Sequence, residues 1–529
     1  MSAPAITPYR SPQAVGRDGF AQLVRAEWTK LRTVRGWVIG LFLVVVLTDL
    51  MGLFAAGSSH TACITGPGRA PRTGRACAVT MPTGPGGQAV TDNYYLAGQS
   101  LAGNGSLTAR VTSLTTEQAS GIGPNPVASL KPGPVPWAKA GIILTASTRP
   151  GAAYAAVLVT PDHGVRMQYD YTGDVAGLPG RVSAAQPRWL RLTRAGAVVT
   201  GYDSADGRHW TRVGQVRLAG LPSSVRAGLF TTAPGWQTTS SSFGGSEGDG
   251  GPSQATATID QVSRSGPWAG RGWPGTAVGG ANLPTVGVHQ AGGQFTIVGS
   301  GDIAPSSPSN GARAQTIEQH LVGVFAGLIV AIVIGVMFMT AEYRRGLIRI
   351  TLAASPGRGR VLVAKALVAA AVMFVAGLVA VIIAVLGGIA VVHSQFGYVY
   401  PVTTLTAIRV VAGTALLIAV VAVLAVALGA ILRRTAAAVT VGIVAVVLPY
   451  VIGIGSVLPI GVAQWLLRVS PAAGFAIEQS IPAYSQVSNS YAPAFGYYPL
   501  APWAGFAVLC GWVALAFALA VVLIRRRDA

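Results

Sequence analysis

Lysine is scarce in this chain of 529 residues, whose 38 basic residues include only Lys30, Lys131, Lys139 and Lys365 as lysines. None of the four follows a glycine, so the chain lacks the Gly-x-x-x-x-Gly-Lys loop that holds nucleotide phosphates. The zinc-protease pattern His-Glu-x-x-His is also missing, and the six histidines are scattered. The sequence therefore predicts no ATPase site, no metal, no cofactor and no catalytic residue in this chain.

Long apolar runs, by contrast, are abundant. Six of them occur, at residues 36–56, 319–340, 366–392, 408–432, 437–460 and 503–524. About 20 apolar residues in a helix, rising 1.5 Å each, cross a hydrocarbon core about 30 Å thick. A cleaved signal peptide is the alternative for the first run, but residues 1–35 before it exceed the usual basic n-region. We predict an all-α membrane bundle of six helices, with the first one uncleaved.

The basic residues are unevenly distributed around these runs. They gather in residues 1–35, between the second and third runs, between the fourth and fifth runs, and in Arg525, Arg526 and Arg527. The two short loops on the other side hold only Arg409 and Arg468. Because Lys and Arg in short loops stay in the cytoplasm, we expect a multi-pass plasma-membrane protein with both termini cytoplasmic and residues 57–318 extracellular. Most of the excess charge would then face anionic inner-leaflet lipid.

The long hydrophilic insertion after the first run is predicted to be all-β. Short β-prone runs alternate with turn residues between 91 and 264, at 107–111, 140–147, 154–160, 165–171, 189–193, 198–202, 225–230 and 256–262. Many strands at this spacing indicate an extracellular β-sandwich or jelly roll. Residues 265–318 are expected to be a Gly/Pro/Ser-rich linker, in which 294–299 would add a strand or cap the sandwich.

Residues 57–90, before the sandwich, form a loop that contains Cys63 and Cys77. In an oxidising exterior we expect these two cysteines to form a disulfide, and two free thiols are the alternative. The third cysteine, Cys510, is interpreted as a small apolar packing residue. The net charge of +20 does not indicate nucleic-acid binding, because residues 60–319 hold 19 basic and 12 acidic residues without a dense basic stripe.

Three aromatic residues of the predicted sandwich are candidate contacts for an extracellular ligand: Trp189, Tyr202 and Trp210. They lie in the run PRWLRLTRAGAVVTGYDSADGRHWTRVG, which predicts two hairpins and resembles part of the concanavalin A-like lectin/glucanase sandwiches. For the two tryptophans, packing in the core is favoured over stacking on a sugar. The aspartates available for glycoside hydrolysis lie beside turns or strand ends, so catalysis is disfavoured.

An amphipathic helix is predicted just before the first span. Phe20, Leu23, Trp28 and Leu31 recur at helical spacing on one face, and basic residues occupy the others. Such a helix suits the inner membrane surface, with Trp28 at the level of the lipid headgroups. Packing on a soluble partner is the alternative.

The segment 341–365 between the second and third runs carries a distinctive charge pattern. An acidic residue and closely spaced arginines precede a Pro-Gly break. The residues concerned are Glu342, Tyr343, Arg344, Arg345, Gly346, Arg349, Pro356 and Arg358. A solvated loop that follows the positive-inside rule is one interpretation, and a docking surface for a cytoplasmic protein is the other.

Several of these motifs together resemble the permease subunits of ABC-2 type transporters, particularly those of high-GC Gram-positive bacteria. They are RAEWTKLRTVRGW, AEYRRGLIRITLAASPGR with VLVAKAL, SPAAGFAIEQS and the terminal RRRDA. The resemblance implies that 341–365 is the coupling loop for a separate ABC ATPase subunit, which would bind ATP and Mg. It also implies a homodimer or a heterodimer with a second permease, and short outer or re-entrant helices in 461–502.

Three functions are therefore compared. The first is the permease of an ATP-driven exporter, the second a membrane-anchored glycan-binding or sensor protein without transport activity, and the third a membrane-tethered hydrolase. The exporter is favoured, and its substrate is not specified by the sequence.

Overall fold

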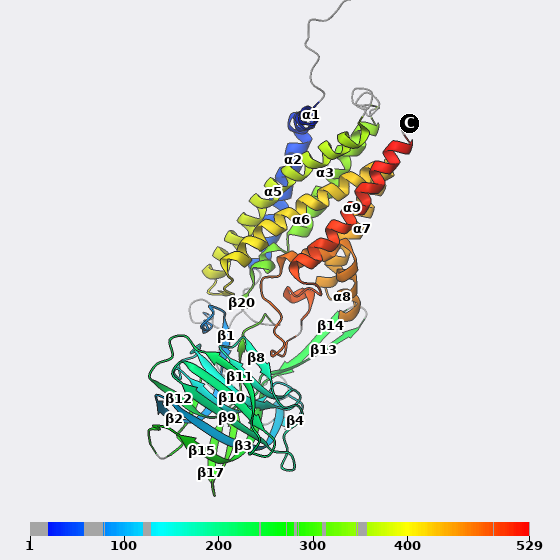
Figure 1. Ribbon diagram of the computed structural model, residues 1–529. Coiled ribbons are helices and arrows are strands. Elements are labelled where there is room, and N and C mark those ends of the chain that lie inside the picture. Colours follow the sequence, from blue (N-terminus) through cyan, green and yellow to red (C-terminus); the bar gives the residue numbers. More distant parts are fainter. Residues whose placement is uncertain are drawn as a thin grey trace, which may run out of the picture.

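The computed structural model describes residues 19–57, 78, 80–119, 129–242, 245–270, 272–279, 283, 285–308, 314–344, 346, 357–489 and 491–527, without the side chains of 239–248, Arg358 and Arg527. Cys63 and Cys77, the predicted disulfide, lie outside these residues. The chain forms a helical bundle with a β-sandwich at one end (Figure 1). The sandwich is inserted between the first and second spans of the bundle.

Six helices of the described residues are long and apolar enough to cross a membrane, which confirms the predicted bundle. They are α2 (Arg35–Gly57), α3 (Val324–Arg344), α5 (Arg358–Ser394), α6 (Thr404–Leu432), α7 (Thr435–Ile454) and α9 (Pro502–Arg527). A 3-10 helix, η3 (Ile317–Leu321), precedes α3, and the amphipathic α1 (Phe20–Thr33) precedes α2. The helix α5 begins at Arg358, before the predicted start at residue 366. The apolar run missed its first turns because they carry arginine and lysine.

The helix α6 occupies the centre of the bundle and packs against α3, α5, α7 and α9. Its interior positions are small or branched apolar residues, which allow close helix contacts where no hydrophobic effect drives association in lipid. At the crossing with α3, a Cβ atom on Gly335 would lie 2.8 Å from the Ala422 carbonyl oxygen. Only glycine fits this crossing without a shift.

Between α7 and α9 the chain makes short helices in the range 461–502, where the resemblance implied them. The helix α8 (Ile460–Val469) and the 3-10 helix η4 (Pro471–Glu478) meet at a bend of 100°. The bend falls at Ser470, which is followed by Pro471, and the Ser470 side chain accepts a hydrogen bond from Ala472 N at 3.3 Å. Proline at the first helical position starts a new helix and cannot continue the old one. A single turn, η5 (Pro493–Phe495), follows.

The insertion is a sandwich of two antiparallel sheets, as predicted. The eight-stranded sheet has the order β11-β10-β9-β3-β15-β18-β17, with β4 beside β3, and the seven-stranded sheet has the order β16-β2-β12-β5-β6-β7-β8. The strands of the first sheet are β3 (Gly105–Ala119), β4 (Leu130–Pro132), β9 (Arg188–Ala195), β10 (Val198–Ser204), β11 (Thr211–Arg217), β15 (Ser253–Ser265), β17 (Gly287–Ala291) and β18 (Gln294–Gly299). Those of the second are β2 (Tyr94–Ala102), β5 (Lys139–Thr145), β6 (Tyr154–Thr160), β7 (Gly164–Tyr169), β8 (Gly173–Ala176), β12 (Ser224–Thr232) and β16 (Gly275–Val278).

All eight predicted runs fall on strands, and the structure adds others. The segment 265–318, expected to be a linker with one extra strand, contains β16, β17, β18 and β19 (Ile303–Pro305). Here β18 pairs with β15 and β16 pairs with β2, so much of this segment belongs to the sandwich. Backbone pairing, which does not require a long apolar run, makes strands of these Gly-rich residues.

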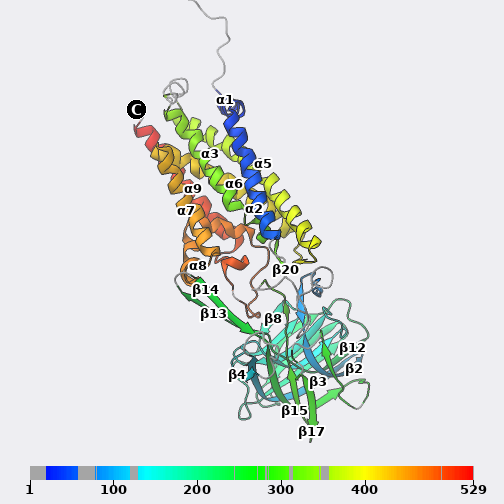
Figure 2. The ribbon, with the colours of Figure 1, turned by 180° about the vertical axis from the view of Figure 1, so that it is seen from behind.

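Smaller pairings join the sandwich to the bundle. The strand β1 (Val90–Asp92) pairs with β19, so the chain enters and leaves the sandwich side by side. The strand β20 (Ala314–Gln315) pairs in parallel with β21 (Tyr398–Val399) at the end of α5. Figures 1 and 2 show the hairpin of β13 (Trp236–Ser242) and β14 (Gly245–Gly251) extending from the sandwich towards α8.

Candidate functional site

The described termini and the basic loops meet at the end of the bundle opposite the sandwich. Figures 1 and 2 show α1, the start of α5 and the end of α9 there. We call this the basic end, after its described residues Arg25, Lys30, Arg32, Arg35, Arg344, Arg360, Arg433, Arg434, Arg525 and Arg526. An even number of spans returns the chain to the side of the membrane on which α1 lies.

The predicted coupling residues are partly buried and partly exposed. Glu342 and Tyr343, in the last turn of α3, face the bundle, and the Arg433 guanidinium lies 4.9 Å from the Tyr343 ring centroid. Arg344 ends α3 with an exposed side chain, and Gly346 follows with a φ of 67°. Arg345, Arg349, Pro356 and the side chain of Arg358 lie outside the described residues. Glu342 is therefore not a surface contact in this conformation, although the sequence motif placed it among the docking residues.

Glu342 instead belongs to a ring of four charges, three of them buried and the fourth, that of Lys30, partly exposed. Lys365 Nζ lies 2.6 Å from Glu27 Oε2 and 3.0 Å from Glu342 Oε1. Lys30 Nζ lies 2.6 Å from Glu27 Oε1 and 2.9 Å from Glu342 Oε1. Lys365 is 1% exposed, and its Nζ also lies 4.0 Å from the Phe338 ring centroid. Because a buried charge is tolerated only when it is paired, this four-charge ring holds α1, α3 and α5 together.

The ring determines which face of α1 packs on the bundle. Leu31 is buried beside Glu27, whereas Phe20 and Trp28 are 39% and 45% exposed and Leu23 is half-buried. The helical periodicity predicts the helix itself, but it misses Glu27 as the buried polar residue. The available signal was the Glu27–Lys30 pair at i,i+3. Burial lowers the pKa of Lys30, yet hydrogen bonds from its ammonium group to Glu27 and Glu342 outweigh burial and leave that pKa above its ordinary value.

At the other end of the bundle, the segment between α8 and α9 supports the sandwich. Gln486 Nε2 donates to the Tyr171 carbonyl oxygen at 3.2 Å. Asn489 Nδ2 donates to Ser307 Oγ at 3.0 Å. A small apolar cluster spans the same junction, with the buried residues Ala89, Ala314, Tyr400 and Ile481. The sandwich thus rests on the loops that close this end of the bundle.

Two carboxyl groups are buried just inside this end. Glu318, in η3, accepts a hydrogen bond from Ser480 Oγ and is 6% exposed, and Glu478, at the end of η4, is 1% exposed. The nearby Arg409, on α6, donates from Nη2 to the Gln479 carbonyl oxygen at 2.6 Å. Carboxyl groups inside a membrane bundle are costly and typically line a polar pathway. Neither glutamate was among the predicted site residues, although Glu478 lies in the motif SPAAGFAIEQS.

The three candidate ligand-binding aromatics share the outer face of the eight-stranded sheet. Trp189 and Tyr202 lie on neighbouring strands, and both are half-buried like Trp210. The Arg191 guanidinium lies 3.9 Å from the Trp210 ring centroid, and that of Arg110 lies 5.6 Å from Trp189. The favoured interpretation of both tryptophans as core residues is wrong. Leu190 and Leu192 fill the inward positions of β9 beside Trp189, and Trp210 lies half-buried against Arg191.

The seven-stranded sheet is covered on both faces. Beyond the main core, its second face packs Tyr94, Ile143, Leu158 and Phe230 against Val90 of β1 and Ile303 of β19. Every residue of β5 and of β6 is buried, which explains their continuous apolar sequences. A sheet that binds a ligand would present an open, concave face to it. In this protein β1 and β19 cover that face of the seven-stranded sheet.

A buried lysine, Lys139 of β5, lies at the junction between the seven-stranded sheet and β19. Lys139 is 0% exposed, and its Nζ lies 2.6 Å from Asp302 Oδ1 and donates to the Ile303 carbonyl oxygen at 2.7 Å. Nearby, Asp92 accepts from the Tyr171 hydroxyl at 2.8 Å and from Gly151 N at 2.9 Å. Burial raises the pKa of Asp92 to about 6, although both hydrogen bonds oppose the shift.

Six spans with both described termini at one end and a β-sandwich at the other define a multi-pass membrane protein with a large domain on one side. A family model described as "ABC-2 family transporter protein" matches residues 22–529. The chain belongs to this family of transporter membrane proteins. No curated protein matches the sequence.

Three solved structures show limited similarity. A functionally unknown protein from Saccharomyces cerevisiae is 14% identical with a TM-score of 0.23, over 36% of this chain and 83% of that chain. Scytalido-glutamic peptidase is 9% identical with a TM-score of 0.23, over 39% and 98%. A GH43 protein from Bacillus licheniformis is 16% identical with a TM-score of 0.16, over 24% of each chain. Similarities this slight assign no function to the sandwich.

Proposed function

We propose that this chain is the transmembrane permease subunit of an ATP-driven exporter, that it pairs with a second permease, and that a separate ABC ATPase works it from the basic end. The observation that carries the proposal is the match of the ABC-2 family to residues 22–529, since the chain itself has no Gly-x-x-x-x-Gly-Lys loop. The basic end is proposed to face the cytoplasm, because its arginines obey the positive-inside rule.

The basic end offers a rigid support for an ATPase. Arg344 is exposed at the tip of α3, one residue after Tyr343 and two after the buried Glu342. A force applied at this tip would be transmitted through the four-charge ring to α1 and α5. The coupling segment 341–365 is therefore the proposed contact.

The sandwich is proposed to cover the outer end of the transport pathway. Its contacts with Gln486 and Asn489 place it on the segment that closes the bundle near Glu318 and Glu478. Substrate leaving the bundle would pass these polar groups and then the junction beneath the sandwich.

The test is co-purification of an ATPase with the tagged full-length chain from its native host. Arg344→Glu with Arg345→Glu should abolish the association, because it reverses the charge at the proposed contact, while membrane insertion is retained. The matched control is Arg208→Glu with Arg212→Glu in the sandwich, which makes the same charge change far from the basic end and should leave the association intact. Purification of the chain without any ATPase would contradict the proposal, as would a C-terminal tag that is accessible outside intact cells.

A second candidate function, binding of cell-wall glycan by the sandwich, is favoured by one observation. Trp189 and Trp210 lie on an outward sheet face and are only half-buried. Half-buried aromatic rings can stack on sugars. A glycan array probed with the full-length protein in detergent tests this function, and Trp210→Ala should weaken any binding found there.

A further inference from the structure

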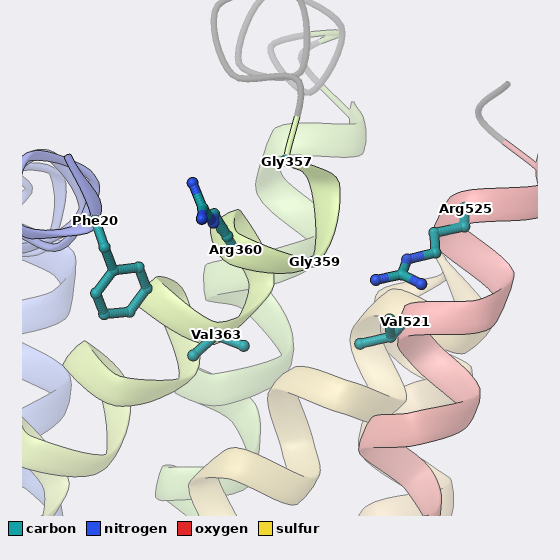
Figure 3. A pocket seen from close by; sticks show the side chains of 7 residues that line it. All are labelled: Phe20, Gly357, Gly359, Arg360, Val363, Val521 and Arg525. Carbon is teal, nitrogen blue, oxygen red and sulfur yellow. The ribbon is translucent and has the colours of Figure 1, made fainter. Parts of the chain in front are cut away.

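A groove of about 490 Å³ opens at the basic end between α1, α5 and α9 (Figure 3). Its lining consists of Phe20 from α1, Gly357, Gly359, Arg360 and Val363 from the start of α5, and Val521 and Arg525 from α9. Two guanidinium groups and three apolar side chains therefore line one concavity, and none of its described lining residues is acidic. This combination suits a ligand that is anionic at one end and apolar at the other.

The two kinds of side chain are separated along the helix axes. Figure 3 shows Arg360 and Arg525 nearer the helix ends, and Val363 and Val521 one turn further into the bundle. On α5 the apolar line continues from Val363, 43% exposed, to Leu367, 50% exposed. Residues four apart lie on the same helix face. The groove thus leads from positive charge into an apolar track on the surface of a membrane span.

Glycine forms the floor of the groove. A Cβ atom on Gly359 would lie 3.7 Å from Arg525 Nη2 and 3.8 Å from Val521 Cγ1. The guanidinium of α9 therefore lies across the first turn of α5, close to its backbone. Neither Gly357 nor Gly359 adds a side chain to the space above this turn.

We infer that this groove binds the headgroup of an anionic phospholipid from the leaflet at the basic end. The phosphate would lie between Arg360 and Arg525, and an acyl chain would follow Val363 and Leu367. Basic pockets between spans on the cytoplasmic side recognise such headgroups, and arginine pairs with phosphate through two parallel hydrogen bonds. A soluble anion would leave the apolar half of the groove empty, and a cytoplasmic protein would not reach the track along α5.

The test is native mass spectrometry of the full-length chain in a neutral maltoside detergent, with phosphatidylglycerol or phosphatidylcholine of the same acyl chains added. The wild-type protein should retain phosphatidylglycerol in preference to phosphatidylcholine. Arg360→Gln with Arg525→Gln should lower this retention roughly 25-fold, since one arginine near an anionic headgroup contributes roughly fivefold. Arg25→Gln with Arg32→Gln removes the same charge from the basic end outside the groove and should leave the retention close to the wild-type value.

A second variant examines the apolar half without touching charge. Val363→Trp fills the track at a position that is already exposed, so folding should be retained while phosphatidylglycerol is lost. Equal retention of the two lipids, or an unchanged Arg360→Gln and Arg525→Gln protein, would overturn the inference. Displacement of the lipid by equimolar glycerol phosphate would mean an anion site without a lipid component and would also overturn it.

The ATPase provides the remaining alternative occupant. If the Arg360→Gln and Arg525→Gln protein keeps its lipid but loses an associated ATPase, the groove is a protein contact and the lipid assignment fails. The lipid measurement itself needs no ATPase, so its result stands whether or not the proposed exporter function holds.

Discussion

Two of the four lysines, Lys139 and Lys365, are fully buried, one in the sandwich and the other at the basic end of the bundle. Lys139 pairs with a single carboxylate, Asp302, and completes its bonding with a backbone carbonyl. Lys365 pairs with two carboxylates, Glu27 and Glu342, which come from different helices. The first lysine links two segments of the sandwich, and the second joins three helices at the basic end. Removing Lys139 would leave one buried carboxylate without its lysine, and removing Lys365 would leave two. We therefore expect the loss of Lys365 to cost more stability.

The largest expected effect comes from Lys365→Met. The change leaves Glu27 and Glu342 with only the half-exposed Lys30, and stranding buried carboxylates costs about 4 kcal/mol. We expect a large fall in the apparent melting temperature of the detergent-solubilised protein, measured by tryptophan fluorescence. Adding Glu27→Gln and Glu342→Gln should restore most of it, because removing all the buried charges is close to neutral. A triple variant as unstable as the single one would show that the ring is not the cause.

Lys139→Met should have a smaller effect, about 3 kcal/mol, because only Asp302 loses its cation. Asp302 Oδ1 still accepts from Ile303 N at 2.8 Å, which limits the cost. Thermal unfolding of the sandwich reports the change, and Lys139→Met with Asp302→Asn should recover part of it. Lys131→Met, at an exposed position on β4, is the matched control and should leave the melting temperature unchanged. A loss from Lys139→Met equal to that from Lys365→Met would remove the distinction between the two lysines.

The pH dependence of the sandwich should reflect Asp92, beside the Lys139 junction. Its pKa is about 6 in the fold, above the ordinary value of 3.8 for an aspartate, so the folded state holds an extra proton between these two pH values. Stability should therefore fall by roughly 2 kcal/mol as pH rises from 4 to 7. Asp92→Asn should flatten this part of the wild-type pH profile of the melting temperature. Identical profiles for the two proteins would contradict the assignment.

Lys30→Met should have the smallest effect. Its side chain is 42% exposed, and such a partly solvated ion pair contributes about 1 kcal/mol or less. A difference between Lys30→Met and Lys365→Met, measured in the same melting experiment, would rank the two cations of the four-charge ring. Equal effects would show that solvent exposure does not weaken the outer pair.

The spans and most strands could be predicted from the sequence because their signals are local. Six apolar runs gave the six spans, and period-two runs such as 189–193 and 198–202 fell on β9 and β10. The strands missed, such as β16 and β17, are only four and five residues long and each begins with glycine, so their order comes from the strands with which they pair.

The candidate sites were harder to predict, because their contacts are long-range. Glu27 and Lys365 are separated by 338 positions, and no periodicity links them. Glu342 was predicted to lie at a docking surface because its motif is charged, and the structure instead buries it between two lysines. For Trp189 the signal was present, since the alternation of Leu190 and Leu192 with polar residues in β9 directs it outwards. The size of tryptophan outweighed that register in the prediction.

The pairing of β1 with β19 has a consequence for the architecture of the chain. Val90 and Pro305 are cross-strand neighbours, so the two ends of the inserted sandwich lie side by side. Ends this close are the usual condition for grafting a domain into a host. The sandwich is therefore suited to removal or exchange as a unit. A short glycine-serine linker from residue 89 to residue 306 would replace it in a shortened protein. Another globular domain with adjacent ends could be inserted at the same place.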